Sequence, residues 1–106
     1  MADNIMVSMN YAIKSIASGE VSGSVTAKQL PSIVGVLVCI KAVKSNTGNV
    51  YLGGNAVTAV NGTTDTTTGI ELGAGEITGW IPCTNLNNFY IICDNAGDDI
   101  TYMILQ

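Results

Sequence analysis

From residue 25 onward the chain alternates between short apolar segments and polar, glycine-rich turns. The apolar segments are residues 25–30, 33–43, 49–53, 56–60, 70–72, 76–81, 89–93 and 100–105. Their spacing and the turn residues between them are typical of strands joined by hairpins and short loops. No strand–helix–strand unit of the parallel α/β kind is present. We therefore expect an all-β fold, an antiparallel and jelly-roll-like β-sandwich of seven to eight short strands.

The longest apolar segment, residues 33–43, predicts a strand that is covered on both faces. Lys41 shares one face with Leu37 and Cys39, so we place this face outward. Val36, Val38 and Ile40 then point into the sandwich. A second sheet would cover the inner face, and the N-terminal arm or another chain would cover the outer one.

Residues 1–18 predict an arm that precedes the sandwich. Apolar residues that share one helical face lie at Ile5, Met9, Ala12, Ile13 and Ile16. An isolated helix of this length is marginal in water, so an extended arm is an equal alternative. The arm has too little polar surface to stand alone, and it packs either on its own domain or on a neighbouring subunit or larger surface.

Residues 19–24 are rich in glycine and serine and predict a flexible joint. The expected organisation is therefore an arm and joint over residues 1–24 and a β-sandwich domain over residues 25–106.

Composition limits the classes of partner. The 106 residues suit one domain, and only 11% of them are charged, against about 25% in ordinary soluble domains. Thr, Asn, Ser and Gly, or another protein, must therefore cover the surface. The net charge of −4 argues against nucleic-acid and membrane partners. The N-terminus lacks a cationic secretion signal, which indicates a cytoplasmic site of synthesis and assembly.

The side chains of most catalytic and metal sites are missing. The chain has no His and no Arg, which removes the commonest general base, the commonest metal ligand and the bidentate anion clamp. Cys39, Cys83 and Cys93 have no metal-binding or redox spacing and are expected to be small buried hydrophobic residues. The acidic segment 94–99 lacks the Gly and Glu of a calcium loop and predicts a hairpin turn. We expect no enzyme activity, no cofactor and no metal.

Two other groups of side chains are candidates for a catalytic or a sugar-binding site. The carboxylates Asp65, Glu71 and Glu76 suit a solvated surface better than a hydrolase pair, because nothing fixes their separation. Tyr51 and Trp80 have aromatic faces that can stack on a sugar, or they pack within the fold.

Several segments in order resemble a group of small structural proteins of tailed bacteriophages. They are residues 29–31, 44–54, 70–76, 86–93 and 96–98. The resemblance covers roughly residues 25–105 and implies a β-sandwich virion component, either a capsid decoration (cement) protein or part of a head or tail fibre. The Thr-rich residues 63–68 and the arm depart from the shared pattern.

We therefore expect a capsid decoration or cement subunit of the virion, assembled in the host bacterial cytoplasm. Its expected partners are the major capsid protein and copies of itself, as a trimer or another cyclic homo-oligomer. The expected contact residues are Ile5, Met9, Ile13, Ile16, Leu37 and Cys39. The alternative is a head or tail fibre module that binds a host-surface glycan through Tyr51 and Trp80.

Overall fold

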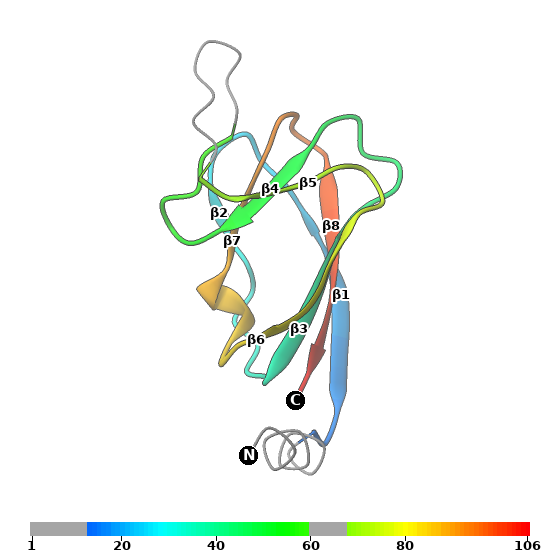
Figure 1. The fold of residues 1–106 in the computed structure, drawn as a ribbon, viewed down its shortest axis with the longest axis vertical. Helices are drawn as coiled ribbons and strands as arrows, with labels where there is room; N and C mark the ends of the chain where they lie inside the picture. Colours follow the sequence, from blue (N-terminus) through cyan, green and yellow to red (C-terminus); the bar gives the residue numbers. More distant parts are fainter. Residues whose placement is uncertain (1–12, 60–67) are drawn as a thin grey trace.

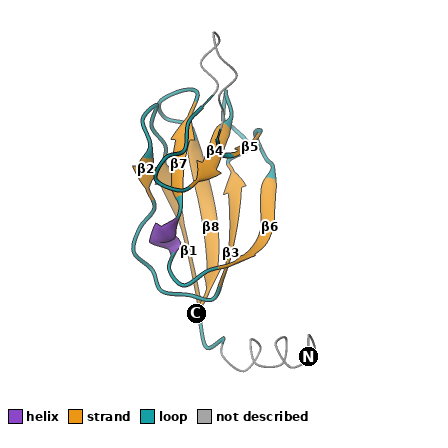
Figure 2. Cartoon of the chain, turned by 60° about the vertical axis from the view of Figure 1, so that its left-hand side comes forward, coloured by secondary structure: helices purple, strands orange, loops and turns teal. Residues whose placement is uncertain are grey.

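The computed structural model describes residues 13–59 and 68–106. Two four-stranded antiparallel sheets make up this part of the chain (Figures 1 and 2). The first sheet has the order β1 (Ile16–Ser22), β8 (Asp99–Leu105), β3 (Leu37–Ala42) and β6 (Ile77–Pro82). The second has the order β2 (Lys28–Gln29), β7 (Tyr90–Cys93), β4 (Val50–Gly53) and β5 (Ile70–Leu72). The only helical element among these residues is the short 3₁₀ helix η1 (Leu86–Asn88), so the all-β prediction is confirmed.

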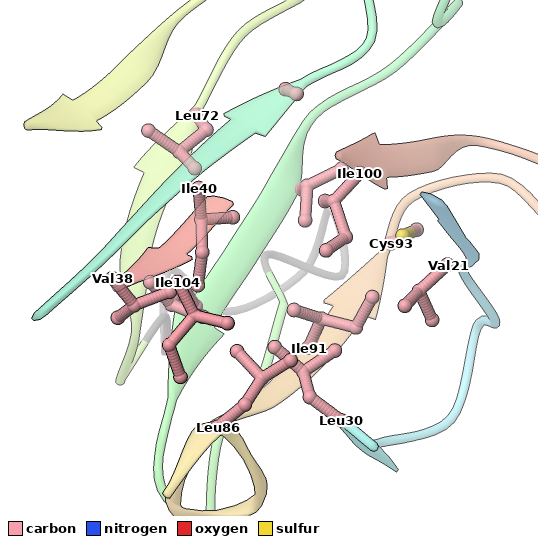
Figure 3. Close-up of a cluster of buried hydrophobic side chains, with 13 residues drawn as sticks. Val21, Leu30, Val38, Ile40, Leu72, Leu86, Ile91, Cys93, Ile100 and Ile104 are labelled. Carbon is pink, nitrogen blue, oxygen red and sulfur yellow. The ribbon is translucent and has the colours of Figure 1, made fainter. Parts of the chain in front are cut away.

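Buried side chains of both sheets form one hydrophobic cluster. Ile40, Ile100 and Ile104 come from the first sheet, and Leu72 and Ile91 come from the second (Figure 3). Strand alternation explains this arrangement, because every second side chain of each strand turns toward the same face.

The predicted inward orientation is confirmed for Val38 and Ile40, whereas Val36 is half-buried, precedes β3 and is not part of the hydrophobic cluster. Val38 and Ile40 are fully buried, whereas Leu37 and Cys39 are half-buried and Lys41 is exposed. The regular strand is shorter than predicted and begins at Leu37. Val34 forms only an isolated bridge with Asn85.

Two other predicted strands are shorter or absent. The segment 25–30 pairs only at Lys28–Gln29. Residues 56–59 form no strand. The described residues do not include 1–12 or 60–67. The second gap holds residue 60 of the predicted strand and the Thr-rich segment up to residue 67. The choice between a helical and an extended arm is therefore untested over residues 1–12.

The prediction of a flexible joint at residues 19–24 is wrong. Residues 16–22 form β1, which pairs with β8 in continuous register from Ile16 opposite Leu105 to Ser22 opposite Asp99. The glycines allow close packing rather than flexibility. A Cβ on Gly19 would lie 2.6 Å from the Tyr102 hydroxyl oxygen.

The carboxylate of Asp98 joins two turns at one end of the fold. It is buried, with 4% of its surface exposed. It accepts hydrogen bonds from the backbone amides of Thr47 (3.0 Å) and Gly48 (2.9 Å). Charge-assisted bonds to backbone amides are stronger than neutral ones, so this carboxylate holds the 45–48 turn against the 94–98 hairpin.

Gly23 gives a direct test of the packing at the end of β1. Its amide donates to Asp98 O (2.8 Å), and a Cβ there would lie 2.5 Å from that same backbone oxygen. We predict that Gly23→Ala lowers the free energy of unfolding by about 1–3 kcal/mol, because overpacking forces the backbone apart. Gly54→Ala, where a Cβ meets nothing within 4 Å, is the matched control and should change it by less than about 0.5 kcal/mol. Urea denaturation measures both, and equal effects would contradict the packing explanation.

The pH dependence of stability tests the Asp98 contacts. Burial opposes ionisation, but the amides of Thr47 and Gly48 outweigh it and hold the pKa of Asp98 below its usual 3.8. A lowered folded-state pKa stabilises the fold above pH 3.8 and loses this contribution as the pH falls through the lowered value. We predict that Asp98→Asn is less stable than the wild type at pH 7 and that the gap narrows toward pH 2.5. A gap that stays constant in urea titrations across this range would contradict the assignment.

Candidate functional site

The outer face of the first sheet is the surface opposite the hydrophobic cluster. Its residues follow from the register, since Leu37, Cys39 and Lys41 point away from the buried Val38 and Ile40. Three rows cross β1, β8, β3 and β6: Ile16, Leu105, Leu37 and Pro82; then Ser18, Met103, Cys39 and Trp80; then Glu20, Thr101, Lys41 and Ile77. Below, "the outer face" means these twelve residues.

Large apolar side chains gather on the outer face. Ile16 is 62% exposed, Ile77 59%, Trp80 51% and Met103 43%. These are four of the seven large apolar side chains that are exposed in the described part of the chain. Single exposed apolar residues are ordinary, but adjacent ones mark a surface that binds another molecule.

A hollow of about 570 Å³ lies on this face. Its apolar lining includes Cys39, Ile77, Trp80 and Met103. Glu20, Lys41 and Thr101 line the hollow at the end where the charged row crosses the strands. Because its apolar part is open and lies in a sheet face, the hollow suits another protein surface.

A bulge in β6 places Trp80 on this surface. The pairing of β3 with β6 shifts register, so that Cys39 is opposite Trp80 while Lys41 is opposite Ile77. Gly79, which directly precedes Trp80, has φ +75°, a conformation that favours glycine. The Thr78 hydroxyl accepts the Ile40 amide hydrogen bond (3.1 Å) in place of a backbone carbonyl. The extra residue lets both Ile77 and Trp80 face outward.

The charged row carries both signs. Glu20 on β1 and Lys41 on β3 flank Thr101 on β8, all at one height along the strands. The protonated Glu20 carboxyl can donate a hydrogen bond to the neighbouring Asp99 carboxylate, and this bond, together with the negative charge of Asp99, raises the pKa of Glu20. The rest of the outer face is uncharged.

The predicted contact residues divide into three groups. Ile16, Leu37 and Cys39 lie together on the outer face, as Leu37 and Ile16 share its first row. Ile13 is half-buried and precedes β1, where the amides of Lys14 and Ser15 donate to Gln106 O. Ile5 and Met9 lie outside the described residues.

The two candidate sugar-binding aromatics are not brought together. Trp80 is on the outer face of the first sheet, whereas Tyr51 is on β4 of the second sheet. Tyr51 is only 2% exposed, and burial raises the pKa of its hydroxyl. Its ring faces are not available to a ligand, so the sugar-stacking prediction is wrong for Tyr51.

Four apolar outer-face residues were missed from the sequence: Ile77, Pro82, Met103 and Leu105. Residues 100–105 alternate, but which half of the alternation is buried depends on their pairing with β3. Met103 becomes part of the site only because it lies opposite Cys39.

Two of the three carboxylates considered as a hydrolase pair, Glu71 and Glu76, have hydrogen-bond partners within the fold. Glu71 Oε1 accepts from the Asn49 side chain (2.5 Å), and Glu76 Oε1 accepts from the Gly73 amide (2.6 Å). Asp65 lies outside the described residues. Within residues 13–59 and 68–106, no three His, Cys, Asp or Glu side chains are grouped to hold a metal ion. Nor does that part of the chain contain a helix long and apolar enough to cross a membrane.

Comparison with known proteins gives no relative: no family model, no curated protein and no solved structure matches the chain.

The thiols of Cys39 and Cys93 differ in burial, and alkylation rates measure this difference. Cys93 is buried, which raises its pKa to about 11, so about one thiol in a thousand is ionised at pH 8. Cys39 is half-buried on the outer face. We predict that iodoacetamide at pH 8 modifies Cys39 in the native protein, while Cys93 reacts only after unfolding. Peptide mass spectrometry reads both sites, and equal native rates would contradict the burial of Cys93.

Proposed function

We propose that this protein is a jelly-roll-like β-sandwich that serves as a bacteriophage virion structural protein, a capsid decoration or cement subunit. In this role it is not an enzyme and needs no cofactor. It binds the major capsid protein and copies of itself, and it stabilises the shell through protein–protein contacts.

The strand connections support the jelly-roll part of the proposal. Every connection between successive strands passes from one sheet to the other except β4 to β5: β1, β3, β6 and β8 belong to one sheet, and β2, β4, β5 and β7 to the other. Eight strands in two antiparallel sheets suit a jelly roll, an architecture found in viral capsid domains and in lectins. The single cluster shared by both sheets is the core that such a sandwich requires.

The apolar outer face is the observation that carries the functional proposal. A cement subunit needs buried contact area, and apolar burial contributes about 25 cal/mol per Å² at each of many copies. A sheet with one apolar face in the core and a second one exposed matches this need. The low charge, 11% of residues, points the same way because charged side chains are depleted at the centre of interfaces.

The contact residues divide by position. Cys39 is in the middle row of the outer face and Leu37 is in its first row, and both are proposed to pack against other subunits. Ile16 begins β1 at one corner of this face, and the arm with Ile5, Met9 and Ile13 leads into that corner. The arm can therefore extend the apolar surface toward the shell or a neighbouring copy.

Trp80 favours the second candidate, a fibre module that binds a host-surface glycan. Its half-exposed ring lines a hollow that also holds Glu20 and Lys41, and sugars combine an apolar ring face with polar edges. Binding of the isolated protein to a glycan array, lost in Trp80→Ser, together with a handful of copies per particle, would favour this candidate.

The direct test of the cement role is occupancy on particles that lack this chain. We predict that the purified protein binds such particles at hundreds of copies, counted by quantitative mass spectrometry. Ile77→Asp should lower the occupancy at least about tenfold, because it places a charge in an apolar contact. Removal of residues 1–12, which leaves β1 intact, should also lower it.

Ile70→Asp is the matched control. Ile70 is 61% exposed, as Ile77 is 59% exposed, but it lies on β5 of the second sheet. The Ile70→Asp variant should occupy the particles as fully as the wild type does, and circular dichroism checks that each variant is folded. Full occupancy of Ile77→Asp, or no binding by the wild type, would contradict the proposal.

A further inference from the structure

We infer that the outer face binds a second copy of this chain face to face, about a two-fold axis that runs parallel to β8. The inference deepens the proposed function and rests on its claim that other subunits cover this face. It names the partner of Leu37 and Cys39 and the way the two copies align.

The strand order makes the outer face complementary to itself. β8 lies between β1 and β3, so a two-fold axis along β8 exchanges the positions of β1 and β3 across the interface. The rotation does not change a residue's position along the strand direction, so each row faces the same row of the partner. Ile16 then faces the partner subunit's Leu37, and Met103 faces the partner's Met103. Aligned sheets that pack face to face keep their strands within about 30° of each other, which is compatible with this arrangement.

The charged row selects this axis. The axis along β8 places Glu20 opposite the partner's Lys41, and the two-fold symmetry forms this pair twice. Within one copy, Glu20 and Lys41 are two strands apart, with their backbones about 10 Å from each other. Asp99, one row beyond Glu20 on β8, faces the partner's Asp99 about the same axis, so this end of the contact has to stay hydrated.

Other two-fold arrangements lack this complementarity. An axis between β8 and β3 would set Glu20 against the partner's Ile77 and Lys41 against the partner's Thr101. An axis across the strands would set the charged row against the apolar row of Ile16 and Leu37. Each leaves charges without partners in a desolvated contact, which is costly.

The area of the face sets the expected affinity. Overlap of β1, β8 and β3 covers about 350 Å² of sheet on each copy, from strand spacing and rise. Trp80 on β6, next to β3, adds contact beside the partner's β1. Counted on both copies, the overlap is about 700 Å² before Trp80 is added, which is below the roughly 1,200–2,000 Å² of stable interfaces, so the expected dimer is weak and transient.

A charge-swap experiment tests the inference on the full chain in solution. Sedimentation equilibrium is measured for the wild type, E20K, K41E and the double variant E20K/K41E. We expect a wild-type dimer, with a dissociation constant raised about tenfold or more by each single reversal. The double swap recreates opposite-charge pairs and should restore the constant to within about threefold.

Lys44→Glu is the control, because Lys44 is exposed outside the outer face and its reversal changes the net charge by the same amount as K41E. It should leave the dimer unchanged. A wild-type chain that stays monomeric, forms a trimer, or dimerises equally well with K41E would overturn the inference. Because no capsid is present, this result is separate from particle occupancy, so the failure of either proposal can be told from the failure of the other.

Discussion

The first sheet has apolar side chains on both faces, and only one of these faces contributes to the buried hydrophobic cluster. Val38 and Ile40 on β3 are fully buried in this cluster, while Leu37 and Cys39 on the same strand turn the other way. Neighbouring strands add Trp80, Met103 and Ile16 to that second apolar surface. Water contact with this surface is unfavourable, and burial by another protein surface relieves it. The proposed role and the proposed dimer both depend on this imbalance.

The rest of the fold gives that surface a defined shape. The bulge at Gly79 turns Trp80 and Ile77 to the same side, although they are three residues apart. The continuous pairing of β1 with β8 places Ile16 in the same row as Leu37 and Glu20 in the same row as Lys41. At one end of the fold, Asp98 fixes two turns through the Thr47 and Gly48 amides. A preorganised surface loses less conformational entropy on binding, which would favour the contacts of the proposed cement subunit.

Much of the fold follows from local patterns, and the site follows only in part. Alternation and one charged residue, Lys41, were enough to orient the central strand correctly. Glycines misled the interpretation of residues 19–24, because the same residue type permits flexibility and close packing, and only the position of Tyr102 distinguishes the two. Trp80 and Met103 join Cys39 through strand register, which is a property of pairing between distant segments. The burial of Tyr51 likewise has no signal in the strand pattern of residues 49–53.

The most direct measurement of whether the outer face is covered uses Trp80, the single tryptophan of the chain. Trp80 is 51% exposed in the isolated chain, so its fluorescence should be red-shifted and readily quenched by acrylamide in dilute solution. In the assembled state, whether on particles or at concentrations that favour self-association, we predict a blue-shifted emission and a quenching constant lowered severalfold. An emission spectrum and a quenching constant that stay the same on assembly would contradict the claim that this face is where the protein binds.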